Sequence, residues 1–221
     1  MTVVRAFAAL LLGFSLQCAA APFVVQLGDA KLNLDTPAGF ADTSPTGSPR
    51  LQEVAEGLTP GSNRILLFAI SDGDLRRFNV GDQPEMRRYM LAVTPRATER
   101  DRMSEGTFRQ LVLGETRGLG KPPPDADFAK YLDSRPIGAT SFLAELRNDA
   151  DVVALLQGTR VKDGGWFRPS EYLLSSTALM LVRGKVLTLS LYTRYEDPAD
   201  LEWIRVATAR WIDDLKRLNQ R

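Results

Sequence analysis

The sequence contains no histidine and a single cysteine among its 221 residues. Without an imidazole the chain can form neither a Ser-His-Asp nor a Cys-His catalytic site, and it offers no histidine ligand for zinc or iron. It also lacks any side chain whose ordinary pKa would make it a proton switch near neutral pH. These absences exclude several large classes of enzyme.

Neither sign of charge is in excess, because 28 lysine and arginine residues face 27 aspartate and glutamate residues. A nearly neutral chain has no general electrostatic attraction for a polyanion, so we expect no nucleic-acid partner. The hydrophobic fraction of 44% is ordinary for a globular chain that buries a core. We expect no stable transmembrane span in the mature chain.

Residues 1–20 have the pattern of a secretory signal peptide. Arg5 supplies a positive charge, residues 6–16 are predominantly apolar, and small residues precede a cleavage site after Ala20. The apolar stretch is too short to span a bilayer about 30 Å thick. The pattern predicts a periplasmic or secreted protein of a Gram-negative bacterium.

Cys18 leaves a second interpretation of this segment open, as the lipidated cysteine of a bacterial lipoprotein. The preceding residues Ser15, Leu16 and Gln17 depart from the usual order, in which leucine is followed by two small residues. With cleavage after Ala20 the mature chain has no cysteine. Its stability must then come from its core rather than from disulfide bonds.

Residues 21–221 are predicted to form one α+β domain, a mainly antiparallel sheet covered by helices. The expected strands are residues 23–27, 31–34, 65–70, 89–93, 141–147, 152–161, 172–183 and 185–195, and the expected helices are 51–58, 104–113 and 198–218. The last two strands are rich in apolar residues, which predicts that both of their faces are covered. Residues 114–127 contain three consecutive prolines and are expected to form a long loop.

The C-terminal helix is the clearest element. Asp197 is a good N-cap, and Pro198 follows at the first helical position. Ile204, Trp211 and Leu215 belong to a single apolar stripe at helical spacing. We therefore expect a long C-terminal helix packed on the sheet.

Aspartate pairs offer candidate metal ligands. Asp125 with Asp127, and Asp149 with Asp151, place two carboxylates two residues apart, as does a third pair at 72 and 74. Such oxygen-rich loops can hold calcium, but aspartate is also a common turn former. A metal-dependent hydrolase that uses these pairs is the alternative to a binding function.

Two further segments are candidate binding sites. The stretch 76–102 is rich in arginine, and Arg87, Arg88 and Arg96 could contact an anionic small ligand through their planar guanidinium groups. Trp166 and Phe167 lie in a glycine-rich loop between predicted strands, where exposed aromatic rings favour contact with a partner protein. Ordinary surface charge and packing on the core are the alternative interpretations.

The segment Pro37-Ala38-Gly39-Phe40, together with the order of elements, resembles the PsbP-like family of α/β/α proteins, including periplasmic members of the DcrB type. The resemblance implies an accessory or binding role rather than catalysis, and no cofactor. The expected function is therefore that of a non-catalytic binding or accessory protein of the cell envelope.

Overall fold

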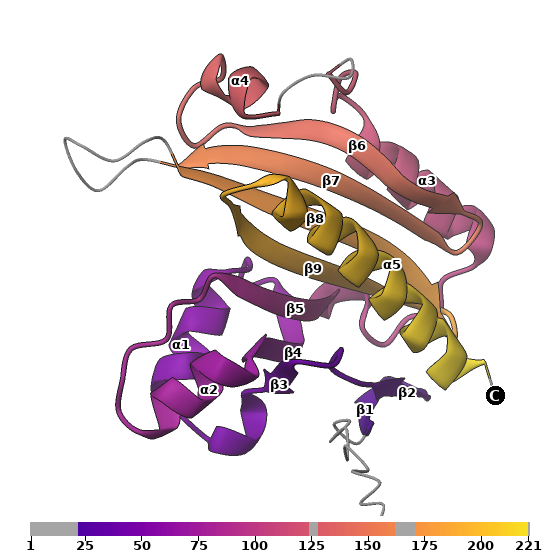
Figure 1. Ribbon diagram of the computed structural model, residues 1–221. Coiled ribbons are helices and arrows are strands. Elements are labelled where there is room, and N and C mark those ends of the chain that lie inside the picture. The colour runs from indigo at the N-terminus through magenta and orange to yellow at the C-terminus, as the bar shows by residue number, and fades with distance from the viewer. Residues whose placement is uncertain (1–21, 124–127, 162–170, 221) are drawn as a thin grey trace, which may run out of the picture.

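The computed structural model describes residues 22–123, 128–161 and 171–220, so the predicted signal peptide lies outside it. Within these residues one antiparallel sheet runs in the order β3-β4-β5-β9-β8-β7-β6, and β1 and β2 form a separate hairpin (Figure 1). The strands are β1 (Phe23–Leu27), β2 (Ala30–Leu34), β3 (Phe40–Asp42), β4 (Asn63–Ser71), β5 (Arg88–Pro95), β6 (Thr140–Asp149), β7 (Val152–Val161), β8 (Glu171–Val182) and β9 (Lys185–Tyr195).

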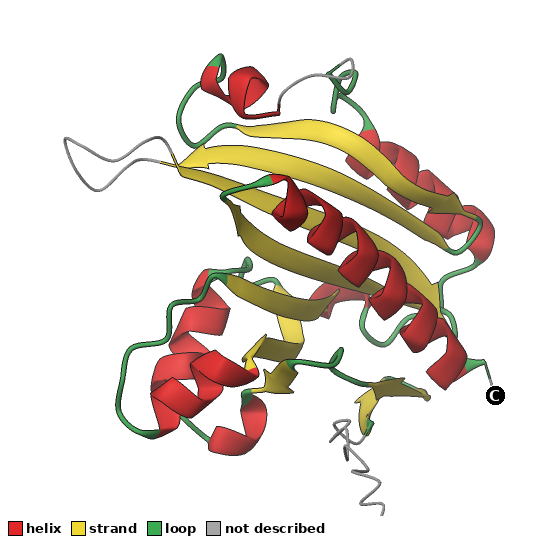
Figure 2. Ribbon diagram, viewed as in Figure 1, coloured by secondary structure: helices red, strands yellow, loops and turns green. Residues whose placement is uncertain are grey.

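Helices lie on both faces of the sheet, with α5 on one face and α3 on the other (Figure 2). The helices are α1 (Pro49–Gly57), α2 (Asp72–Asn79), α3 (Glu105–Thr116), α4 (Phe128–Asp133) and α5 (Pro198–Asn219), with short 3-10 turns at Ser44–Thr46 and Arg96–Thr98. We call the face under α5 the covered face and the opposite one the open face. This arrangement confirms the predicted α+β class and the long C-terminal helix on the sheet.

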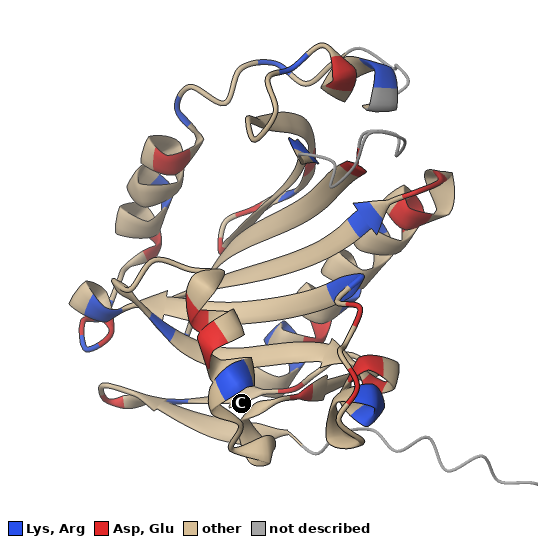
Figure 3. Cartoon of the chain, turned by 90° about the vertical axis from the view of Figure 1, so that its left-hand side faces the viewer, with Lys and Arg blue, Asp and Glu red and all other residues tan. Residues whose placement is uncertain are grey.

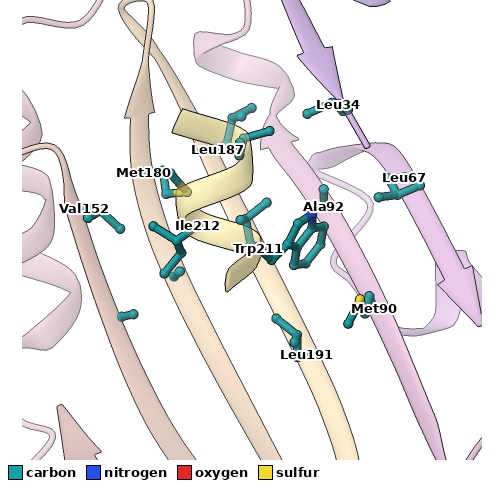
Figure 4. Packing of buried hydrophobic residues seen from close by; sticks show 14 of the residues in the cluster. Leu34, Leu67, Met90, Ala92, Val152, Met180, Leu187, Leu191, Trp211 and Ile212 are labelled. Atoms are coloured by element: carbon teal, nitrogen blue, oxygen red, sulfur yellow. The ribbon is translucent and has the colours of Figure 1, made fainter. Parts of the chain in front are cut away.

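The covered face holds the main core. Trp211 and Ile212 of α5 lie among aliphatic side chains of the central strands, such as Met180, Leu187 and Leu191 (Figure 4). The indole Nε1 of Trp211 donates a hydrogen bond of 3.1 Å to the backbone oxygen of residue 35, so its one polar atom is satisfied. Burial of this apolar stripe is what holds α5 to the sheet.

The start of α5 follows its predicted capping. The Asp197 side chain accepts a hydrogen bond of 2.7 Å from the backbone amide of Ala199, and Pro198 is at the first helical position. Asp200 completes a capping box by accepting from the backbone amide of Asp197. In the middle of the helix, Ser176 and Thr208 share a buried hydrogen bond of 2.6 Å between β8 and α5.

The end of α5 is tied to the N-terminal hairpin by two asparagines. The Asn219 side chain accepts from the backbone amide of Asn33 at 2.9 Å and donates to its backbone oxygen at 2.8 Å. The side-chain amide of Asn33 in turn donates a hydrogen bond of 3.0 Å to the backbone oxygen of Leu218. β2 therefore pairs with a helix end in the way that it would pair with another strand.

Two local predictions were wrong. Residues 72–79, where no helix was expected, form α2, because the Ser71 hydroxyl caps the helix by accepting from the Asp74 amide at 3.0 Å. The predicted loop at 114–127 begins later, because α3 continues to Thr116, and α4 follows the loop.

None of the helices in the described part of the chain is long and apolar enough to cross a membrane.

Candidate functional site

In the part of the chain that the structure describes, helices cover the open face only at its two ends. α1 and α2 pack over β4 and β5, where Phe68, Leu91 and Val93 are buried. α3 packs at the other end through Phe108 and Val112. Between these helices β8 alternates, with every second residue from Leu174 buried on the covered face and the intervening residues half-buried on the open face. The prediction that both faces of this hairpin are covered is thus correct for one face and only partly correct for the other.

A row of side chains crosses this uncovered stretch of the sheet. The strand registers place five residues side by side on the open face, in the order Phe142, Gln157, Ser175, Tyr192 and Tyr89. Adjacent strands are about 4.8 Å apart, so the backbones at Phe142 and Tyr192 are roughly 14 Å apart across Gln157 and Ser175. The row therefore has an aromatic wall at each side and a polar floor.

The tyrosine wall is rigid because its two rings stack. The ring centroids of Tyr89 and Tyr192 are 4.7 Å apart, with an angle of 15° between the planes. Burial raises the pKa of Tyr89 to about 12 and also raises the pKa of Tyr192. Both phenols therefore stay protonated at neutral pH. Ser175 flanks Tyr192 on the side away from Tyr89, and this short side chain leaves room beside the ring.

The next row toward α3 continues the floor. Leu155 pairs with Thr177, and Thr177 pairs with Ser190. We call the stretch between Phe142 and Tyr192, floored by Gln157, Ser175, Thr177 and Leu155, the channel. No hydrogen bond joins the side chains of Gln157, Ser175 or Thr177 to any described residue. Their donors and acceptors are therefore available to a ligand.

The channel becomes apolar as it approaches α3. A cavity of about 330 Å³ lies beside this helix, lined by Gln157 and Thr177 together with Leu111, Leu155 and Leu179. A second cavity of about 530 Å³ lies along the other side of α3. The two cavities share lining residues at the end of α3, namely Thr116, Leu119, Val153 and Leu155. A ligand that follows the channel can thus extend beneath the last turn of the helix.

Charged side chains are sparse along the middle of the long strands and gather on helices and at strand ends (Figure 3). Arg194 lies two residues beyond Tyr192 on the same face of β9, and its side chain is exposed. It makes no ion pair with any residue in the described part of the chain. Among the described residues, the channel therefore has an uncharged floor with one unpaired cation, Arg194, at its polar end.

Two of the predicted binding arginines stabilise the fold. Arg87 and Arg88 both donate to the buried carboxylate of Asp200, at 3.1 Å and 2.8 Å. Arg88 also lies over the Trp203 ring, 4.2 Å from its centroid. Burial alone would raise the pKa of Asp200, but hydrogen bonds from Arg88 and the Glu196 amide, with the charge of Arg87, lower it. These guanidinium groups are largely committed to the start of α5.

The remaining binding candidates are apart from this cluster. The Nε atom of Arg96 donates to the Asn63 oxygen at 3.1 Å, and its side chain borders a cavity of about 480 Å³ beside α1. Trp166 and Phe167 lie outside the described residues. The structure thus brings Arg87 and Arg88 together but leaves Arg96 at a separate place.

The aspartates proposed as metal ligands have cationic partners. Lys216 contacts Asp151 at 2.6 Å and Asp149 at 3.5 Å, and Arg147 contacts Asp149 at 2.6 Å. Hydrogen bonding from Arg147, opposed by desolvation, lowers the pKa of Asp149. Asp125 and Asp127 lie outside the described residues. In the remainder no group of three or more potential metal-ligating side chains occurs.

The channel was missed by sequence reasoning, which treated the last strands only as core. The available signal was the run Ser175-Ser176-Thr177, which interrupts the apolar residues of β8 with three hydroxyl-bearing side chains. Their neighbours Gln157 and Tyr192 can be added only when the strand register is known. The uncovered part of the open face is therefore the feature that was hardest to predict from the sequence.

The fold defines an α+β protein in which one antiparallel sheet has a helix-covered face and a partly open one. A comparison with protein-family models finds no match, and a comparison with curated protein sequences finds none either. Among solved structures, the chain is similar to the Ran-binding protein Mog1p of Saccharomyces cerevisiae. That match has 13% sequence identity and a TM-score of 0.41, and it covers 90% of this chain and 94% of that chain.

Proposed function

We propose that this chain is an exported, non-catalytic binding or accessory protein of the bacterial cell envelope, and that it holds its ligand in the channel. The observation that carries the binding role is the row from Phe142 to Tyr192. It combines two aromatic walls with polar side chains that have no partner in the described residues. Binding sites typically combine an apolar surface with a few such polar groups.

Export rests on the first twenty residues, whose charged, apolar and small-residue regions follow the order of a signal peptide. The resemblance to PsbP-like proteins of the DcrB type belongs to the same proposal. It favours an accessory role in the envelope. A chain without histidine also lacks the most common general base, which favours binding over catalysis.

Export is tested by expressing the full chain in a Gram-negative host and fractionating the cells. We expect a periplasmic product whose intact mass corresponds to cleavage after Ala20. Recovery of the uncut chain in the cytoplasm would contradict export.

The binding role is tested by capturing components of an envelope extract on the immobilised mature protein. Thr177→Trp fills the floor of the channel, whereas Val206→Trp places the same ring on an exposed position of α5 and serves as the matched control. We expect at least one component that the wild type and Val206→Trp retain and Thr177→Trp loses. Identical retention by all three proteins would contradict binding in the channel.

A further inference from the structure

The chemistry of the channel changes along the strands, and this change carries information about its ligand. The α3 end is lined by aliphatic side chains, including Leu111, Leu155 and Leu179. The opposite end presents Gln157, Ser175 and the stacked tyrosines, followed by Arg194. A ligand that satisfies both ends must have an apolar part and a polar part in one molecule.

The positive charge at the polar end of the channel favours a negatively charged ligand group. Arg194 is exposed on the open face and has no ion-pair partner among the described residues. A planar guanidinium group pairs well with a carboxylate, and a single unpaired cation balances a single negative charge. Among the described residues the floor itself carries no charged side chain, whereas the carboxylates of Glu145 and Glu115 border its α3 end, so a second negative charge on the ligand would be repelled there.

The dimensions of the channel favour a long, extended ligand. Thr188, which pairs with Leu179 at the α3 end, lies six positions before Arg194 on β9. This spacing corresponds to roughly 20 Å along the strand. The floor between Phe142 and Tyr192 is three strand spacings wide and accommodates an extended chain. The cavity of about 330 Å³ beside α3 then provides a mainly apolar end for that chain, with Glu115 among its lining residues.

We propose that the channel binds a long-chain fatty carboxylate, with its head group at Arg194 and its aliphatic tail beneath α3. This inference rests on the proposed binding function and specifies its ligand. Gln157 and Ser175 would donate hydrogen bonds near the head group, while Leu155 and Leu179 would contact the tail. Binding of this kind gains most of its free energy from the buried methylene groups.

The test uses dodecanoate below its micelle-forming concentration, with isothermal titration calorimetry of the mature protein. We expect saturable binding of one molecule per chain. Decanoate, which is two methylene groups shorter, should bind roughly tenfold more weakly because each buried methylene contributes to affinity. Dodecyltrimethylammonium, which has a similar tail and the opposite charge, should bind much more weakly than dodecanoate.

Two kinds of variant locate the ligand. Thr177→Trp should abolish dodecanoate binding. Gln157→Trp also fills the channel, from the neighbouring strand β7, and replaces the first variant if Thr177→Trp does not fold. Arg194→Gln should weaken binding roughly five- to tenfold by removing a charged hydrogen bond, whereas Arg210→Gln on the exposed side of α5 should leave it unchanged. Circular dichroism melting curves establish that each variant is folded.

Several outcomes would overturn the inference. They are no binding of dodecanoate to the wild type, equal binding of the two oppositely charged amphiphiles, or unchanged binding in both folded tryptophan variants. If these occur while Thr177→Trp still loses an envelope component, the fatty carboxylate is wrong and the binding function stands. If the channel variants also retain every envelope component, both proposals fail.

Discussion

The two faces of the central sheet are built from the same strands but from different kinds of side chain. On the covered face, β8 and β9 present Met180, Leu187 and Leu191 to Trp211 of α5, and these residues are buried. On the open face, the same strands present hydroxyl groups and a tyrosine to a stretch of sheet without a helix. The contrast teaches that the covered face holds the main core, whereas the stretch of the open face between α1/α2 and α3 can carry binding because fewer core contacts depend on it.

The largest expected effect concerns the centre of the covered face. Trp211→Ala should lower the free energy of unfolding by about 3–5 kcal/mol, since it removes a buried aromatic side chain and leaves a cavity. Phe142→Ala on the open face should cost much less, because that ring is only half-buried at an edge strand. Urea denaturation of both variants measures the difference, and equal losses would break the distinction between the faces.

The second prediction concerns the start of α5. Asp200→Asn should destabilise the protein by about 2 kcal/mol at neutral pH, because it weakens the capping box and two charged hydrogen bonds. The folded-state pKa of Asp200 is lowered, so its contribution is present above the unfolded pKa of about 3.9 and is lost as pH falls through the folded value. The stability difference between wild type and variant should therefore shrink below about pH 4.

Glu202→Gln is the matched control for that experiment, because Glu202 lies two residues further along α5 and is exposed. It should change the free energy of unfolding by less than about 0.5 kcal/mol. A difference between wild type and Asp200→Asn that stays constant down to pH 2 would show that the ionised carboxylate is not what stabilises the helix.

The smallest expected effect gives the sharpest comparison, because it uses neighbouring residues on opposite faces. Ser176→Ala removes the buried hydrogen bond to Thr208 and should cost about 1 kcal/mol. Ser175→Ala should change stability by less than about 0.5 kcal/mol and weaken ligand binding instead. Denaturation and calorimetry on the same two variants measure both quantities. A stability loss in Ser175→Ala equal to that in Ser176→Ala would contradict the assignment of the two faces.

Much of the fold was predictable because its signals are local. Arg183 and Gly184 both adopt positive φ values, 53° and 77°, as the tight turn between β8 and β9 requires, and the sequence indicated this turn. The capping residues and apolar stripe of α5 were equally clear. α2 was missed because Asp72-Gly73-Asp74 has the composition of a turn, although Ser71 acts as an N-cap.

The candidate site was not predictable, because it depends on pairing between distant strands. Arg87 and Arg88 were interpreted as ligand contacts since their partner, Asp200, lies more than 100 residues later in the sequence. The channel depends on the register of β6, and β6 is irregular where it pairs with β7, between Phe142 and Ala144 and between Glu145 and Arg147. A bulge shifts the alternation of side chains, so the sequence alone does not reveal that Phe142 faces Gln157.

The reciprocal bonds between Asn33 and Asn219 have a consequence for the order of assembly. They join residues 186 positions apart, so the β1-β2 hairpin cannot form these bonds until α5 has folded. Contacts of such high sequence separation slow folding, because a long loop has to close before they form. The chain therefore cannot complete these bonds until the last turn of α5 is in place, and deleting that turn should release the β1-β2 hairpin from the helix.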